Sequence, residues 1–164
     1  MKVKKIQTAA FAGHRQLPKD ITPLAAATRD AVVGLIKRGV ICFGGGGAFG
    51  FDTLAAKVVL ELRDTVYPQI RLIQVLPFRG MDSGWTQEQK DEFDEINSRA
   101  DNIIWLTEEY TGDELYRIKN RNLVDRSAHL IAYCTDINGN SGAAACYRDA
   151  VKKEINIILL NERL

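Results

Sequence analysis

The chain alternates short apolar runs with longer amphipathic segments, and this alternation constrains the fold more than any other feature. Six runs have the length and composition of strands, and Gly, Pro or Asn residues punctuate the joins. The expected strands are Gln7–Phe11, Val40–Phe43, Arg71–Leu76, Asn102–Leu106, His129–Tyr133 and Asn156–Leu160. Because strands that alternate with helices pair in parallel through right-handed crossovers, the pattern predicts a doubly wound α/β fold.

Five helices are expected between these strands. They are expected to begin at Thr22-Pro23, at Asp52 or Thr53, at Thr86, near residue 113 and near residue 142. Thr86 with Gln89 has the spacing of a capping box, and Thr22-Pro23 has the pattern of an N-cap followed by the first helical residue. The prediction is a single-domain, Rossmann-like three-layer α/β/α sandwich with a mainly parallel sheet of about six strands.

Length and charge limit the alternatives. A chain of 164 residues with 46% hydrophobic content is long enough for one core and too short for two ordinary domains, so one domain is expected over residues 1–164. Lys and Arg (22) nearly balance Asp and Glu (21), so no overall charge attracts nucleic acid or an anionic membrane. The apolar stretch after the basic N-terminus stops at Gly13, too short for a signal peptide or membrane span.

Cysteine usage favours a reducing compartment. Cys42, Cys134 and Cys146 are odd in number and lack C-x-x-C spacing. We therefore expect reduced, buried thiols and a cytoplasmic location. Two distant histidines and scattered cysteines show no recognised ligand spacing, so no metal site is expected.

A glycine-rich segment follows the second expected strand. Gly44–Gly47 and Gly50 stand between that strand and an amphipathic helix. Glycine lets main-chain N–H groups approach an anion, and a helix N-terminus adds a partial positive charge, so the segment is typical of a phosphate-binding loop. A bare tight turn explains the glycines equally well, since neither the dinucleotide-binding fingerprint nor a Walker motif is present.

Other unusual residues follow the remaining strands. Gly13-His14-Arg15 ends the first strand, Pro77 follows the third, and Ser141-Gly142 comes after the fifth. In open parallel sheets, ligands bind outside the carboxyl ends of the strands. The sequence therefore predicts a ligand site at this edge.

Several motifs together resemble the YpsA-like family of the SLOG superfamily. They are Ala10–Arg15, Gly45–Gly47 with Gly50–Ala56, Arg121-Asn122 with Val124–Ser127, and Ser141-Gly142. The resemblance spans nearly the whole chain and implies a Rossmann-like fold related to the lysine-decarboxylase-like phosphoribohydrolases and to the DNA-processing protein DprA. Members of this family are regarded as binders of nucleotides or nucleotide-derived ligands.

The resemblance to the phosphoribohydrolases is partial at their signature motifs. Arg121-Asn122 falls on their Arg-Lys pair, whereas Asn138–Cys146 falls on their Pro-Gly-Gly-x-Gly-Thr-x-x-Glu motif with Cys146 in place of the glutamate. Cleavage of an N-glycosidic bond generally needs a carboxylate, which cysteine does not supply. We therefore expect ligand binding without that hydrolase activity, and no catalytic residue is assigned.

The expected site residues also have structural explanations. For Arg15 the alternatives are binding a phosphate and capping the end of a neighbouring strand or helix. For His14 they are a role as acid, base or hydrogen-bond donor and plain packing. Asp52 accepts a ribose hydroxyl or caps its helix. Trp85 stacks on a base or staples the next helix. Arg117, Arg121 and Asp125 share one helix face, where exposed ion pairs would suffice.

These observations lead to one main hypothesis, which is binding of a nucleotide or nucleotide-derived phosphate ligand in a sensor or regulatory role. The candidate ligand-binding residues are Gly13, His14, Arg15, Gly44, Gly45, Gly46, Gly47, Gly50, Asp52, Pro77, Arg121, Asn122, Ser141 and Gly142. One alternative is a nucleotide-processing hydrolase whose acid is Asp52 or Asp125. A second is a DNA-linked adaptor similar to DprA, although the charge balance argues against nucleic acid. No membrane partner is expected, and a homodimer is left open.

Overall fold

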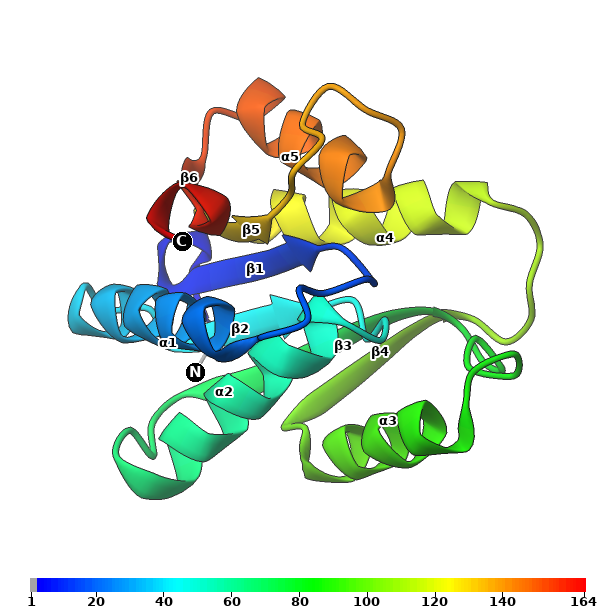
Figure 1. Cartoon of the computed structure of the whole chain (residues 1–164), viewed down its shortest axis with the longest axis horizontal. Helices are drawn as coiled ribbons and strands as arrows, with labels where there is room; N and C mark the ends of the chain where they lie inside the picture. The colour runs from blue at the N-terminus through cyan, green and yellow to red at the C-terminus, as the bar shows by residue number, and fades with distance from the viewer. Residues whose placement is uncertain (1–2) are drawn as a thin grey trace.

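A computed structural model describes residues 3–164 and contains one six-stranded, all-parallel sheet (Figure 1). The strands are β1 (Thr8–Gly13), β2 (Cys42–Gly45), β3 (Arg71–Phe78), β4 (Asn102–Thr107), β5 (His129–Tyr133) and β6 (Asn156–Leu159). Their order across the sheet is β4-β3-β2-β1-β5-β6. The predicted α/β fold and its number of strands are confirmed.

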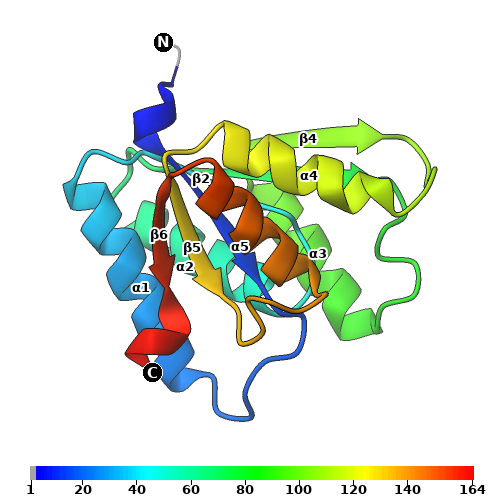
Figure 2. The same cartoon turned by 90° about the horizontal axis from the view of Figure 1, so that it is seen from above.

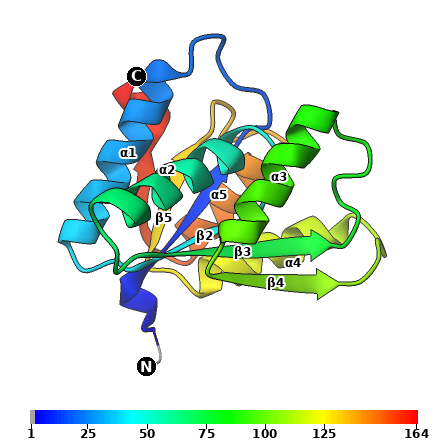
Figure 3. The same ribbon diagram turned by 90° about the horizontal axis from the view of Figure 1, so that it is seen from below.

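Five α-helices cover the two faces of the sheet. They are α1 (Thr22–Lys37), α2 (Phe51–Thr65), α3 (Gln87–Arg99), α4 (Glu114–Asp125) and α5 (Gly142–Lys152), and short 3-10 turns lie at Lys5–Gln7 and Leu160–Arg163. Helices α4 and α5 cover one face (Figure 2), and α1, α2 and α3 cover the other (Figure 3). The result is a three-layer sandwich.

Strand β1 shows why the sheet must be covered on both sides. Phe11 packs against Phe43 and Phe51 on the side of α1 and α2, with ring centroids 6.0 and 6.2 Å away. Ala10 and Ala12 point to the other side, into a cluster with α4 and α5. A strand that is apolar on both faces is characteristic of a buried parallel sheet, and the small alanines let α5 approach closely.

Two strands continue further than the sequence indicated. Gly44 and Gly45, expected in a loop, are buried strand residues that lie opposite Ile73 and Gln74 of β3. Strand β3 continues through Pro77, which lies beyond the last residue that pairs with β2. The missing N–H of proline therefore removes no hydrogen bond from that side of the sheet.

The helix caps follow the predictions in part. Thr86 and Gln89 form the predicted capping box, and Ser141 caps α5 by accepting the Ala144 N–H at 3.1 Å. The capping prediction for Asp52 is wrong, because α2 begins at Phe51 and Asp52 lies in its first turn. Thr22 is likewise the first residue of α1 and not its cap.

Within residues 3–164, none of the helices is both long enough and apolar enough to cross a membrane.

Candidate functional site

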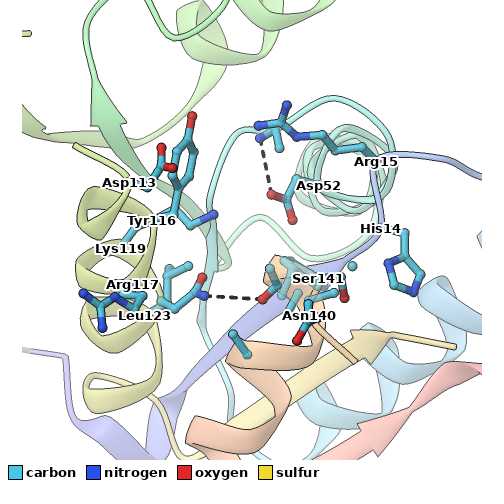
Figure 4. A pocket seen from close by; sticks show the side chains of 18 residues that line it. His14, Arg15, Asp52, Asp113, Tyr116, Arg117, Lys119, Leu123, Asn140 and Ser141 are labelled. Atoms are coloured by element: carbon cyan, nitrogen blue, oxygen red, sulfur yellow. Dashed lines mark hydrogen bonds between the residues drawn. The ribbon is translucent and has the colours of Figure 1, made fainter. Parts of the chain in front are cut away.

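The candidate site is a cavity of about 740 Å³ at the carboxyl ends of the strands. In the sheet, β1 has β2 on one side and β5 on the other, so the order of the strands reverses at β1. The cavity opens at this reversal. Figure 4 shows side chains from the end of β1, the start of α2, one side of α4 and the start of α5 around it. This is the position at which open α/β sheets bind ligands.

Gly50 joins two walls of the cavity. Its φ of +90° and ψ of −124° are accessible in practice to glycine alone, and the position of an added Cβ would overlap the backbone of Arg15. The Phe51 N–H at the start of α2 donates to the carbonyl oxygen of His14 at 3.0 Å. The start of α2 is thereby held directly against the end of β1.

Asp52 is the most unusual residue of the cavity wall. Asp52 is buried, with an exposed fraction of only 8%. One carboxylate oxygen, Oδ2, accepts the Ala48 N–H at 3.3 Å, while Oδ1 is buried without a hydrogen-bond partner. Burial raises the pKa of Asp52, against the opposing effects of Lys119, the Ala48 N–H and Arg15. A buried acceptor with no partner is costly, so it marks a place where a ligand can donate.

Lys119 extends from α4 over the glycine segment. A Cβ added to Gly46 would lie 2.9 Å from the Lys119 Nζ, so the side chain lies directly against that glycine. The Nζ also lies 5.9 Å from the centre of the Tyr116 ring. Lys119, Arg117 and Arg15 therefore bring positive charge to the same cavity that contains Asp52.

The start of α5 forms the wall opposite α2. The Ser141 hydroxyl caps the helix and also donates to Asp136 Oδ1 at 2.8 Å, which helps to hold the pKa of Asp136 below its usual range. Gly142 and Ala143 line the cavity, and as first-turn residues their N–H groups have no acceptor within the helix. Together with the helix dipole they favour an anion at this point.

His14 turns from the cavity edge toward the segment after β5. Its Nε2 accepts the Thr135 N–H at 2.9 Å and lies 3.2 Å from the Thr135 Oγ1. The ring packs edge-on against Tyr133, with the ring centroids 5.6 Å apart. His14 thus positions the loop that leads to α5.

The cavity brings together six of the residues predicted from the sequence. These are Gly13, His14, Arg15, Asp52, Ser141 and Gly142. The glycines Gly44–Gly47 are buried and do not line it, and neither does Gly50. Pro77 is buried within β3.

The predicted pair on α4 lies outside the cavity. Arg121 is exposed, and Asn122 turns to a second cavity of about 530 Å³ that Gly44 also lines. Asp125, considered as an acid, is exposed and pairs with Lys153 at 3.2 Å. Leu123, which follows Arg121 along α4, still lines the cavity, so Arg121 lies outside it because its side chain is on the exposed side of the helix.

Sequence reasoning missed Lys119, although a signal was present. Leu115 and Leu123 are buried residues of α4, and Lys119 lies midway between them at i+4. A lysine on the apolar stripe of an amphipathic helix must point toward the protein interior or into a cavity. Asn120, Tyr116 and Asp113 line the cavity beside it and were also missed.

Trp85 and Cys146 both lie outside the candidate site. Trp85 packs edge-on between Phe49 and Phe93, with centroids 5.1 and 5.2 Å away, and does not line the cavity. Cys146 is 1% exposed, and burial raises its pKa to about 12. The residue that replaces the phosphoribohydrolase glutamate is therefore an inert, buried thiol at pH 7.

Comparison with known proteins identifies relatives of the chain. A UPF0398 protein of Halalkalibacterium halodurans is 31% identical over 137 residues that cover 82% of this chain and 70% of that protein. A UPF0398 protein of Bacillus thuringiensis is 30% identical over 87 residues, or 52% of this chain and 47% of that protein. The chain thus matches about half the length of the Bacillus relative.

Solved structures show the same fold. DNA processing protein A from Helicobacter pylori, described in a study of its single-stranded DNA binding mode, has a TM-score of 0.67 at 20% identity over 94% of this chain and 65% of its own. DprA from Streptococcus pneumoniae has a TM-score of 0.61 at 20% identity, over 92% and 48%. Residues 14–160 match the profile of the YpsA family, described as the YspA SLOG family. The chain therefore belongs to the YpsA SLOG family.

Proposed function

We propose that the cavity binds a nucleotide or nucleotide-derived ligand, with a phosphate at the start of α5 and a sugar hydroxyl or base amino group at Asp52. The observation that carries this proposal is the buried Asp52 Oδ1, which has no partner and belongs to a residue lining the cavity. Such an oxygen needs a donor, and hydroxyl and amino groups of a nucleotide are donors.

The charges of the cavity support a ligand with both a phosphate and neutral donors. The first-turn N–H groups at Gly142 and Ala143 and the side chains of Arg15 and Lys119 suit an anion. Asp52 would repel a second phosphate placed against it, so its neighbourhood favours the uncharged part of the ligand. The volume of about 740 Å³ falls in the range of small-molecule and cofactor sites.

This arrangement keeps the phosphate position that the sequence suggested at the start of α5, but it leaves out the glycine loop and uses a different basic residue of α4. The sequence suggested phosphates on both the Gly44–Gly47 loop and the Ser141-Gly142 helix start, with Arg15 and Arg121 neutralising their charge. In the structure Lys119 lies against Gly46, and Arg121 lies outside the cavity. Substitutions at these two basic residues of α4 therefore distinguish the site proposed from the structure from the site expected from the sequence. Lys119 is inside the cavity, and Arg121 serves as its matched control.

Isothermal titration with a panel of mononucleotides, dinucleotides, cyclic nucleotides and ADP-ribose tests the proposal. Inorganic phosphate and unphosphorylated nucleosides test the two halves of the ligand separately. A hydrogen bond to a charged group contributes about 1.5–3 kcal/mol, so Lys119→Gln should weaken binding about 10- to 150-fold. Arg121→Gln should leave the affinity within about twofold.

Three results would contradict the proposal. Equal losses in Lys119→Gln and Arg121→Gln, or a loss in Arg121→Gln alone, would exclude the cavity as the phosphate site. Nucleosides that bind as tightly as their nucleotides would exclude the phosphate contact. Tight, salt-sensitive binding of single-stranded DNA with no response to nucleotides would favour the DNA-linked alternative.

A second candidate, a nucleotide-processing hydrolase, is supported by one observation. A buried carboxyl with a raised pKa at a cavity wall is a candidate general acid, and Asp52 has this environment. Product formation from a nucleoside monophosphate, abolished in Asp52→Asn while nucleotide binding persists, would support it. Binding without turnover in the wild type would leave the ligand-binding proposal and remove this one.

A further inference from the structure

Three potential metal ligands meet beside the candidate cavity, although the other two lie 120 and 122 positions after the first in the sequence. His14 follows β1, while Cys134 and Asp136 follow β5. Their ligand atoms all lie within 4.8 Å of one another. Spacing along the sequence gave no hint of this cluster, because the adjacency of β1 and β5 creates it.

The distances within the cluster match the edges of a zinc coordination tetrahedron. Asp136 Oδ1 lies 3.3 Å from the Cys134 Sγ and 3.4 Å from the His14 Nε2. Zinc–ligand bonds of about 2.0–2.3 Å at tetrahedral angles place neighbouring ligand atoms about 3.3–3.8 Å apart. Two of the three edges therefore have nearly the required length without any ion.

The surrounding contacts hold the ligands in place. The backbone of Cys134 is fixed on both sides by Asn161, which accepts its N–H at 3.2 Å and donates to its carbonyl oxygen at 2.9 Å. The Ser141 hydroxyl donates to Asp136 Oδ1 at 2.8 Å. Outer contacts of this kind orient metal ligands and raise affinity.

The cluster is also accessible to an ion. Cys134 is buried at its base, whereas the side chains of His14 and Asp136 are 18% and 40% exposed. Occupancy would cost His14 the hydrogen bond that its Nε2 accepts from Thr135. Thr135 is exposed, so its released N–H can bond to water.

We propose that His14, Cys134 and Asp136 form a site for a single Zn²⁺ ion, with water as the fourth ligand. On binding, the Cys134 thiol loses its proton to solvent and its sulfur bonds to the metal, so the ion displaces one proton from that residue. Thiolate, imidazole and carboxylate together suit zinc better than Mg²⁺ or Ca²⁺, which prefer oxygen ligands. The site neighbours the ligand cavity but does not depend on its proposed function.

Equilibrium dialysis of the reduced protein against Zn²⁺ tests the site, with metal content measured by mass spectrometry. The wild type should bind one zinc per chain. Because even outer-shell changes cost about 10–100-fold in metal affinity, Cys134→Ser and His14→Gln should each weaken binding at least tenfold. Cys42→Ser is the matched control, since Cys42 is also a buried free thiol but lies outside the cluster.

A second readout uses the unaltered protein, so that a poorly folded variant cannot obscure the answer. Co²⁺ bound through a thiolate gives a near-ultraviolet charge-transfer band, which Zn²⁺ should abolish by displacement. Absence of stoichiometric zinc binding would overturn the proposal, as would Co²⁺ binding without this band. Equal weakening by Cys42→Ser and Cys134→Ser, with helical circular dichroism retained, would also overturn it.

Discussion

Replacing Gly50 by alanine places a methyl group where the backbone of Arg15 already lies. An ideal Cβ on Gly50 would be 2.6 Å from the Arg15 carbonyl carbon and closer still to its oxygen. Neither the backbone at Gly50 nor the backbone at Arg15 can shift easily, because the neighbouring Phe51 N–H is hydrogen-bonded to His14. The substitution should therefore strain the joint between β1 and α2.

The size of the effect follows from two contributions. A side chain at φ +90° and ψ −124° costs about 1–3 kcal/mol in backbone strain. Overpacking against a fixed backbone costs about another 1–3 kcal/mol. Together they should lower the free energy of unfolding by about 2–6 kcal/mol, a large fraction of the roughly 5–15 kcal/mol available to a domain.

Gly34→Ala provides a control of opposite sign. Gly34 lies inside α1, and nothing approaches within 4 Å of its added Cβ. Alanine should stabilise that helix by about 1 kcal/mol. In thermal unfolding, the midpoint temperature should rise by about 2–4 °C in Gly34→Ala and fall by about 4–24 °C in Gly50→Ala.

Two results would refute this reasoning. A Gly50→Ala protein within about 1 kcal/mol of the wild type would show that the Arg15 segment can move aside. The walls of the cavity would then be less rigid than the contacts indicate. A destabilised Gly34→Ala protein would instead contradict the expectation that the open space beside Gly34 accepts a methyl group.

Two further predictions concern the carboxylates of Asp52 and Asp101. Because burial raises the folded-state pKa of Asp52, the folded protein holds this proton more tightly, and stability falls as pH rises from about 3.8 through the raised value. The stability of Asp52→Asn relative to wild type should therefore increase over that range and then level off in urea titrations; a difference independent of pH would contradict this. Asp101 Oδ2 accepts from the Arg63 Nη1 and the Leu72 N–H, both at 2.8 Å, so Asp101→Ala should cost about 1.5–3 kcal/mol by chemical denaturation. Asp91 is exposed, and Asp91→Ala should change the free energy of unfolding by less than about 0.5 kcal/mol. Equal losses in Asp101→Ala and Asp91→Ala would refute a stabilising role for the Asp101 hydrogen bonds.

Local signals account for the parts of the fold that were predicted correctly. The spacing of apolar residues identified the six strands and five helices, because each buries a face at its own period. The caps at Thr86 and Ser141 could be predicted because a hydroxyl and a backbone N–H three residues later meet within one helical turn. At Gly44 and Gly45 the same approach was wrong. Glycine usually punctuates loops, whereas at Gly44 the Leu123 side chain, 3.1 Å from an added Cβ, leaves little room for a larger residue within the strand.

The candidate site was only half predictable, since its residues come from segments far apart in the chain. The strand ends that carry Gly13, Arg15 and Ser141 could be placed at one edge, because all strands of a parallel sheet point the same way. Lys119 lines the cavity and Arg121 does not, because residues two positions apart on α4 point to different sides of the helix.

Sequence by itself determined the secondary structure, the parallel sheet and the edge at which a ligand site would lie, because periodicity and caps act within a few residues. Only the tertiary structure decided which strands are neighbours. Placing β5 beside β1 brings His14 within 3.4 Å of Asp136 and leaves Asp52 facing the start of α5 across the cavity. That choice depends on packing whole helices against the sheet, a long-range balance that no local pattern contains.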